Sequence, residues 1–396
     1  MLDVKIHTDV NSLQKLWCTF QHMAVCGPHE TWEWNKAWVE TAGKNEKPII
    51  AVAYNKAGEV VFILPLAMRE HMGCQVLEWL GSEQGNYATG LFHPTAWTDK
   101  SMPRNRALLK LILDKLPRVD AVHLDKKLVA INTFRSPLAG LMRVSEASSG
   151  HSFPLGENWE DHFNDRFSSS ARSKLRRDER RIADNGDVTY KQVTDVHEKL
   201  KFTDQVISQK SDFFAERGIR DFLQDDGMRD FLHRLSQIPE SNPDLSARLY
   251  TCHLDGVLLA AKMGVVHNNI YYGMISSTTP SAIRRYGPGS VLFKHSVELM
   301  AEEGIERLDC GAGEDETKRR WCTEEHARLH LIAPVSVKGY AYASLLFAQL
   351  KAKLFIKNHP GLWGRYKRTR AWIACYLRPS STECAEETAA ALRAEA

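Results

Sequence analysis

The stretch Arg284-Arg285-Tyr286-Gly287-Pro288-Gly289-Ser290 follows a strand-like run and opens a helix-like run. A glycine-rich turn in that position presents main-chain N–H groups to an anion, and the helix N-terminus behind it adds roughly half a positive charge. Arg284 and Arg285 add full charges beside the turn. We therefore expect a phosphate or pyrophosphate site here, or else a plain strand-to-helix turn in which glycine satisfies the backbone.

The type of phosphate ligand follows from what the turn contains. It lacks the Gly-Lys-Ser/Thr ending of a P-loop, which argues against nucleotide hydrolysis. It is not a dinucleotide fingerprint, because Leu292 stands at the third glycine position. It does match the pattern Arg/Gln-x-x-Gly-x-Gly, through Arg284, Gly287 and Gly289. That pattern resembles the acyl-CoA pyrophosphate loop of the GNAT acyltransferase superfamily.

The segments around the turn follow a definite order. Two strand-like runs, 247–254 and 257–266, are joined by Asp-Gly, which is a strong hairpin signal. A third strand-like run, 270–275, precedes the turn. Apolar residues then recur at helical spacing over 291–300, and 305–310 is strand-like. Meander, glycine turn, helix and strand is the order found in the core of the GNAT fold.

The segment after that last strand, Leu308–Trp321, resembles the signature of one GNAT branch. This branch is the CelD/BcsL-like family of bacterial acetyltransferases, which is associated with cellulose and other exopolysaccharide synthesis. Its members carry an Asp, a Gly-Asp/Glu turn, a Lys and an aromatic residue at this spacing, and commonly a Tyr where this chain has Thr317. The basic segment 169–181 and the tryptophan-rich segment 30–38 resemble further parts of the family, so the resemblance covers residues 10–340.

The resemblance implies an α/β (α+β) fold of two tandem GNAT-like units, arranged as in FemABX proteins. Each unit would be a mixed, mainly antiparallel sheet flanked by helices. A cleft between two such units is a natural place for a bulky acceptor. We expect a degenerate first unit over 1–150, an acyl-CoA-binding unit over 151–335, a basic helical extension over 336–378 and a flexible tail over 379–396.

The resemblance also implies acetyl-CoA as co-substrate, with no metal. The turn's amides and its two arginines would hold the pyrophosphate, although Pro288 has no N–H to offer. A main-chain amide on the strand 270–275 would polarise the thioester carbonyl. The expected cofactor-binding residues are Arg284, Arg285, Tyr286, Gly287, Gly289 and Ser290.

Three residues are candidates for proton transfer. Asp309, at the end of its strand, could take a proton from an amine or hydroxyl acceptor directly or through water, or could simply cap the next turn. Glu314 on the following loop could play the same role or be a solvated charge. Tyr272 could protonate the departing thiolate or be a core aromatic residue, and because side chains alternate along a strand, only one of Tyr271 and Tyr272 faces the cleft.

Four residues are candidates for acceptor binding. Arg172 and Arg176 are four apart and share a helical face, and guanidinium groups suit phosphate or carboxylate oxygens. The alternative is a solvated face neutralised by neighbouring carboxylates. Lys318 and Trp321 share a face if their segment is helical. The resemblance makes Lys318 an acceptor or phosphate contact, whereas Trp321 could equally be plain packing.

Aromatic residues of the first unit have two interpretations. Gly85-Asn86-Tyr87 and the tryptophans Trp32, Trp34 and Trp38 could form a platform for a sugar ring. Aromatic side chains are also the usual filling of a core. We expect the core role.

Composition limits the function classes. The 396 residues carry a formal net charge of only +3, which argues against bulk electrostatic nucleic-acid binding. The 8 cysteines are scattered without metal spacing, which favours reduced thiols and no structural zinc. We expect no signal peptide, because the opening residues lack a basic region followed by an apolar one, and no transmembrane helix, because no apolar run reaches the ~20 residues that span a bilayer. A cytoplasmic location is expected, and the basic C-terminal helices either contact anionic lipid at the inner membrane or pack across the two units.

These features predict an acyl-CoA-dependent acyltransferase. It would move an acetyl group to an amine or hydroxyl acceptor, a sugar or polysaccharide precursor, by direct attack on the thioester. The first alternative is a FemABX-like transferase that uses charged tRNA. Such a transferase would be indicated by a donor loop without the CoA-type glycine turn, which this chain has. A non-catalytic GNAT-derived module of a polysaccharide-synthesis complex is the second.

Overall fold

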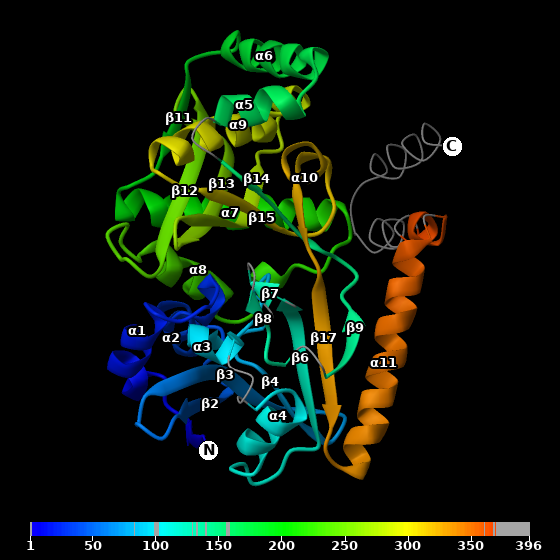
Figure 1. The fold of residues 1–396 in the computed structure, drawn as a ribbon. Helices are drawn as coiled ribbons and strands as arrows, with labels where there is room; N and C mark the ends of the chain where they lie inside the picture. Colours follow the sequence, from blue (N-terminus) through cyan, green and yellow to red (C-terminus); the bar gives the residue numbers. More distant parts are fainter. Residues whose placement is uncertain are drawn as a thin grey trace.

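The computed structural model describes residues 2–82, 84–98, 103–128, 130–131, 134–138, 141–155, 159–359, 361–366 and 369. The predicted flexible tail over 379–396 lies outside these residues, as does part of the predicted extension. Within them, the chain forms two large mixed sheets flanked by helices (Figure 1). This architecture confirms the predicted α/β fold class.

The first sheet is built mostly from the N-terminal third of the chain. Its strand order is β1-β2-β3-β4-β6-β17-β9, and β5 also pairs with β3. Neighbouring strands are antiparallel except β4 and β6. A tight turn at residues 55–58, closed by Gly58 N donating to Asn55 O at 3.1 Å, joins β2 to β3. The strands are β1 (Asp3–His7), β2 (Lys47–Tyr54), β3 (Val60–His71), β4 (Cys74–Trp79), β5 (Leu91–Phe92), β6 (Ala121–Leu128), β9 (Met142–Ser145) and β17 (Arg328–Pro334).

The second sheet has the order β11-β12-β13-β14-β15-β10-β16. The Asp255-Gly256 hairpin is confirmed, because both residues have positive φ, 50° and 77°. Only β14 and β15 run parallel. The strands are β10 (Gly150–Pro154), β11 (Val188–Gln192), β12 (Ser246–Leu254), β13 (Val257–His267), β14 (Ile270–Thr278), β15 (Arg307–Ala312) and β16 (Glu324–His326), and a separate pair is β7 (Ala130–Ile131) with β8 (Phe134–Arg135).

Helices cover both sheets. Several begin with a side-chain cap, such as Ser168 on α6 and Asp195 on α7, which accept from main-chain N–H groups three residues on. The helices α7 and α8 were not assigned from the sequence. The helices are α1 (Gln14–Gln21), α2 (Trp32–Glu40), α3 (Pro94–Thr98), α4 (Arg106–Leu113), α5 (Trp159–Arg166), α6 (Ser169–Ala183), α7 (Val196–Glu216), α8 (Met228–Ser236), α9 (Pro288–Glu302), α10 (Glu316–Trp321) and α11 (Val337–Asn358).

The chain returns to the first sheet after completing the second. β17 lies between β6 and β9, although its residues fall in the range predicted for the second unit. Figure 1 shows it as the long orange strand that reaches down beside β6. At its start, Arg328 donates to Ser148 O at 2.8 Å and to Asn86 O at 2.9 Å. The two units are therefore joined by shared strands as well as by packing.

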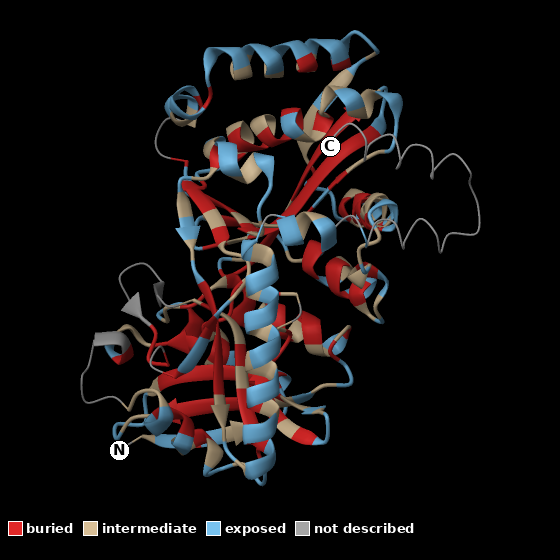
Figure 2. Cartoon of the chain, turned by 90° about the vertical axis from the view of Figure 1, so that its right-hand side faces the viewer, coloured by how far each residue is buried: buried red, intermediate tan, exposed pale blue. Residues whose placement is uncertain are grey.

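A continuous apolar cluster also joins the units. It combines α1 and α2 of the first unit with α7, α8, β12 and β13 of the second. Trp34, 1% exposed, and Trp38, 3% exposed, meet Phe231 of α8 edge-on with ring centroids 5.1 and 5.3 Å away. Figure 2 shows buried segments running through both halves of the molecule. The predicted core role of the tryptophans is confirmed.

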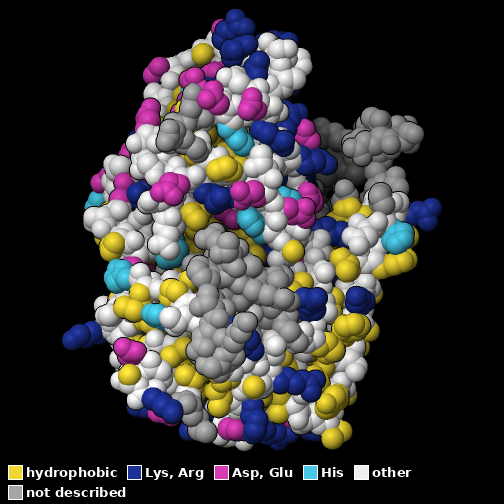
Figure 3. All heavy atoms as spheres, in the orientation of Figure 1, with side chains coloured by type: hydrophobic (Ala, Val, Ile, Leu, Met, Phe, Trp, Pro, Cys, Tyr) yellow, Lys and Arg dark blue, Asp and Glu magenta, His cyan; other side chains and the backbone are white. Residues whose placement is uncertain are grey.

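The C-terminal helix α11 packs along β17 and β9. It also exposes apolar side chains, including Val337 at 89% and Phe355 at 57%. Figure 3 shows hydrophobic and Lys/Arg side chains next to one another along this flank. Among the described residues, no helix combines the length and the apolar character needed to cross a bilayer.

Replacing Trp34 with alanine tests the joint between the units. The indole fills a buried space between α2 and α8, so we expect a loss of ~3–5 kcal/mol in the free energy of unfolding. Urea denaturation followed by circular dichroism measures this loss. The control is Tyr340→Ala on exposed α11, which should change stability by no more than ~0.5 kcal/mol. Equal effects of both variants would contradict the joint.

Candidate active site

The second sheet opens between its two parallel strands. β14 and β15 are paired only at Ile270↔Arg307, Tyr271↔Leu308 and Tyr272↔Asp309. Beyond that point β14 continues to Thr278 and β15 to Ala312 without pairing to each other. We call this region the β14–β15 opening. Main-chain groups that would otherwise bond across the sheet are available to a ligand there.

An asparagine of the first unit occupies the narrow end of the opening. Asn86 Nδ2 donates to Gly273 O of β14, and Asn86 Oδ1 accepts from Ala312 N of β15, both at 3.4 Å. Gly311, with φ of 74°, makes room for it, because a Cβ there would lie 2.8 Å from Asn86 Nδ2. The first unit thus holds the two strands apart. The sequence offered a sugar platform or a core role for the segment around Asn86, of which we expected the core role, and it did not indicate this contact.

A bulge lies in β14 next to the opening. Met263 of β13 pairs with Ile275, whereas the next residue, Gly264, pairs with Gly273. Met274 is therefore the extra residue on β14. A bulge leaves its extra residue outside the regular ladder and turns the local backbone. The strand predicted to offer an amide to a thioester carbonyl has its irregularity at this position.

The predicted glycine turn lies at the other end of β14 and begins α9. Gly287 has φ of 62°, in the left-handed region that glycine adopts at little cost. At Gly289, a Cβ would lie 3.0 Å from Thr278 Oγ1, so the helix start sits close against the end of β14. The local geometry therefore favours glycine at both positions. The positive end of the α9 helix dipole faces the opening.

The amides of this turn are not all free. Gly287 N donates to Arg284 O at 3.0 Å, and Ser290 N donates to Gly287 O at 2.9 Å. Across the described part of the chain, Gly289 N has no such main-chain acceptor. Of the amides of Gly287, Gly289 and Ser290, the structure thus leaves that of Gly289 open to an anion. Arg284 lines the pocket together with this turn, and its Nη1 lies 3.3 Å from Glu216 Oε2.

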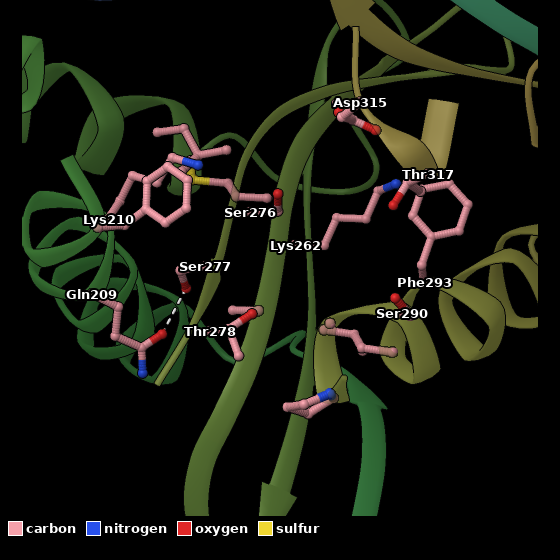
Figure 4. A pocket seen from close by; sticks show the side chains of 18 of the residues that line it. Gln209, Lys210, Lys262, Ser276, Ser277, Thr278, Ser290, Phe293, Asp315 and Thr317 are labelled. Atoms are coloured by element: carbon pink, nitrogen blue, oxygen red, sulfur yellow. Dashed lines mark hydrogen bonds between the residues drawn. The ribbon is translucent and has the colours of Figure 1, made fainter. Parts of the chain in front are cut away.

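A pocket of about 410 Å³ connects the turn with the opening. This volume is in the range of small-molecule sites. Figure 4 shows side chains from both sides of the sheet pointing into it, with Ser277 donating to Gln209 of α7 at 2.7 Å. The elements that contribute are α7, β13, β14, the turn with the start of α9, β15 and α10. Of the predicted residues, those in the lining are Arg284, Gly287, Gly289, Ser290 and Lys318.

Asp309 lies on the other side of β15 and faces the first unit. Tyr87 Oη donates to Asp309 Oδ2 at 2.8 Å, and Gly311 N donates to Oδ1 at 2.7 Å. Burial raises the pKa of this carboxyl to about 6, although both hydrogen bonds act to lower it. A carboxyl with that pKa is well matched to accepting a proton near neutral pH. The Gly311 bond also fits the turn-capping role.

The other two predicted proton-transfer residues differ in setting. Tyr272 shares the face of Asp309, and burial raises the pKa of its phenol, which makes it a weaker acid than an ordinary tyrosine. Glu314 is half-exposed, and His151 Nε2 lies 2.8 Å from its Oε1. Neither residue is part of the pocket lining.

The predicted acceptor-binding residues separate in the structure. Lys318 lines the pocket, where its Nζ donates to Ala312 O at 2.5 Å and lies 3.9 Å from Asp315. Trp321 is buried among aromatic rings, 4.9 Å from Phe167, which is a packing role. Arg172 donates to the carbonyls of Asn164 and Phe167 and so ties α6 to α5.

Three further predicted residues lie outside the pocket lining. Arg176 of α6 bonds Ser173 Oγ at 3.4 Å. Arg285 donates to Tyr286 Oη at 2.8 Å, and Arg181 of α6 lies 5.8 Å from the Tyr286 ring. The basic helix α6 and the glycine turn therefore meet at Tyr286, outside the pocket.

Several pocket residues were not identified from the sequence. Lys262 interrupts the apolar run of β13, and a charge within a buried strand is a signal that could have been used. The helix α7, which the sequence analysis did not predict, contributes Gln209, Lys210 and Phe213. In the described ranges, no three His, Cys, Asp or Glu side chains are grouped to hold a metal ion.

Comparison with known proteins agrees with this geometry. Residues 169–319, which include the glycine turn, match the family model described as acetyltransferase (GNAT) domain. No curated protein matches the chain. Residues 169–319 of the second unit thus match a GNAT acetyltransferase domain.

Solved structures of similar fold extend over both units. FemX is 12% identical with a TM-score of 0.54, covering 83% of this chain and 97% of its own. The C-terminal domain of a putative lysylphosphatidylglycerol synthetase from Agrobacterium fabrum is 12% identical with a TM-score of 0.50, covering 84% and 95%. A conserved protein of unknown function from Bacteroides thetaiotaomicron is 10% identical with a TM-score of 0.50, covering 83% and 99%. These likenesses show the fold.

Alanine at Gly311 tests how the opening is held. The added Cβ strains a residue whose φ is positive and clashes with Asn86 Nδ2. We therefore expect the free energy of unfolding to fall by ~2–5 kcal/mol. Gly58→Ala is the matched control, because Gly58 has φ of 81° with nothing within 4 Å of a Cβ, and should cost ~1–2 kcal/mol. Chemical denaturation compares the two. Equal losses would contradict the insertion of Asn86.

Proposed function

We propose that this protein transfers an acyl group from acyl-CoA, in the simplest case acetyl-CoA, to an amine or hydroxyl acceptor by direct attack on the thioester. One observation carries the proposal: a single pocket joins the glycine turn at the start of α9 to the β14–β15 opening. The turn suits the pyrophosphate and the opening suits the extended pantetheine arm. The GNAT family match over residues 169–319 supports the same class.

The acceptor would approach from the side of the first unit. Because neighbouring side chains of a strand point to opposite faces, Asp309 faces that unit while Cys310 lines the donor pocket. Asp309 would take the acceptor's proton directly or through water, with Tyr87 holding the carboxyl in place. Positioning the two substrates on either side of β15 would supply much of the rate.

The finer identity of the acceptor rests on sequence resemblance. The CelD/BcsL-like signature in Leu308–Trp321 favours a sugar or polysaccharide precursor as the acceptor. Work in the cytoplasm, with α11 touching the inner membrane, would fit a polysaccharide-synthesis setting. Release of free CoA thiol from acetyl-CoA, measured against amino sugars, neutral sugars and peptide amines, identifies the acceptor class.

A second candidate is transfer from charged tRNA. The similarity of fold to FemX over 83% of the chain favours it. The discriminating experiment offers aminoacyl-tRNA and acetyl-CoA separately as donors to the same acceptor panel. Transfer from the tRNA alone would replace the acyl-CoA proposal.

Charge reversal at Arg284 tests the donor site. Arg284→Glu removes a guanidinium from the pocket mouth, and we expect acetyl-CoA binding to weaken about tenfold to a hundredfold. Isothermal titration calorimetry measures the affinity. Arg220→Glu is the charge-matched control, since Arg220 is exposed, pairs with Asp225 and does not line the pocket. Unchanged affinity in Arg284→Glu would overturn the site.

The pH profile tests the proposed base. Asp309 must be ionised to accept a proton, so kcat/KM should fall about tenfold per pH unit as the pH drops through about 6, the pKa of this carboxyl. The acidic limb should disappear in Asp309→Asn, at a much lower rate, and should keep its position in Glu314→Gln. A limb that is lost in Glu314→Gln instead would make Glu314 the base.

A further inference from the structure

A buried lysine stands in the donor pocket without a counter-charge. Lys262 of β13 is 7% exposed, and its ammonium lies over two aromatic rings, 3.8 Å from the centroid of Phe293 and 5.3 Å from that of Tyr271. Among the described residues, no carboxylate pairs with it and no oxygen accepts a hydrogen bond from it. An unpaired buried cation is costly, so its presence points to an anionic partner that arrives with the ligand.

The position of Lys262 indicates which part of the ligand it meets. Lys262 is opposite Ser276 on β14, between the glycine turn and the bulge at Met274. Its side chain shares the α9 face of the sheet with Phe293, and Thr317 of α10 lines the same pocket. Cys310 lines the same pocket from the adjacent β15. Lys262 therefore reaches across the β14–β15 opening on the side away from Asp309.

Attack on a thioester releases a thiolate, an anion that a nearby cation such as the Lys262 ammonium would stabilise. When the acceptor nitrogen or oxygen bonds to the carbonyl carbon, the C–S bond breaks and the sulfur leaves with the electron pair. If the acceptor approaches from the Asp309 side, the thiolate departs on the opposite, α9 side. We propose that the Lys262 ammonium stabilises this thiolate and gives it a proton, so that CoA leaves as the neutral thiol.

The site takes up one proton and releases one proton in each turnover. Asp309 takes one proton from the acceptor, Lys262 gives one proton to the sulfur, and solvent then returns each group to its starting state. This role rests on the proposed acyl-CoA-dependent function. Tyr272 is less suited to this step, because it shares the face of Asp309 and its phenol is a weakened acid.

The other cations of the pocket are less suited to this step. The Lys318 ammonium is already bonded to Ala312 O and lies near Asp315. Lys210 lies over the Phe213 ring of α7, on the other face of the sheet. Among the described cations of the pocket, Lys262 is the one that lies on the α9 side, is buried and has no ion-pair or hydrogen-bond partner.

The acidity of Lys262 suits a thiol. Burial lowers the pKa of its ammonium to about 8, close to the value of ~8.5 typical of a thiol, so the proton moves between groups of similar affinity. The titratable and charged groups that face it are Tyr271 from β14, Cys310 from β15, Asp315 and Lys318 from α10 and its N-cap, and Cys322 after α10. Of these, Lys318 acts in the same direction as burial, while Asp315 and the thiols oppose it.

The decisive experiment measures the thiol of bound CoA. Ultraviolet absorbance of the thiolate gives the pKa of CoA bound to the wild type, to Lys262→Met and to Lys110→Met, an exposed lysine of α4 that serves as control. We expect the wild type and Lys110→Met to lower this pKa, and Lys262→Met to raise it by about one unit or more relative to them. Lys262→Arg should keep the lowered value, because it keeps the charge.

Two further measurements complete the test. Lys262→Met should lower kcat by about 10²–10⁴-fold while acetyl-CoA affinity changes by less than ~3-fold, and Lys262→Arg should recover little of kcat because it donates a proton poorly. The fold should survive, since methionine replaces a buried unpaired charge, and unfolding by urea should require equal or higher concentrations. Equal thiol pKa values in wild type and Lys262→Met, with CoA bound to both, would overturn the role of Lys262 alone. Failure of the wild type to bind CoA would overturn the proposed function together with it.

Discussion

The parting of two parallel strands is the constraint on which the rest of this structure depends. β14 and β15 pair at three positions and then separate, so the sheet gives up hydrogen bonds that it would otherwise form. Asn86 of the first unit partly replaces them by bonding to both strands. The first unit therefore contributes directly to the opening beside the second unit's pocket, because its Asn86 bonds to both of the strands that part there.

The alternation of side chains along β15 then divides the site into two halves. Asp309 points to the interface of the two units, where Tyr87 and Tyr272 surround it, while Cys310 points into the donor pocket with Lys262 and Lys318. A carboxyl whose pKa is raised thus lies on one side of the strand and an ammonium whose pKa is lowered lies on the other. Groups whose pKa values are shifted in this way suit acid–base work near neutral pH.

Local patterns allowed much of the fold to be predicted from the sequence. The Asp255-Gly256 hairpin and the glycine turn at Gly287 depend on the positive φ of residues that are neighbours in the chain. Features that depend on distant contacts were not predicted. The insertion of Asn86, the return of β17 to the first sheet and the contribution of α7 to the pocket join residues far apart in sequence.

A crystal structure of the protein with CoA is the most direct test of the donor site. We expect the phosphates to contact the turn from Gly287 to Ser290 and the pantetheine arm to lie in the β14–β15 opening, with its sulfur on the α9 side next to Lys262. Density for CoA at any other place on the chain, or an opening without CoA at a saturating concentration, would rule out this donor site.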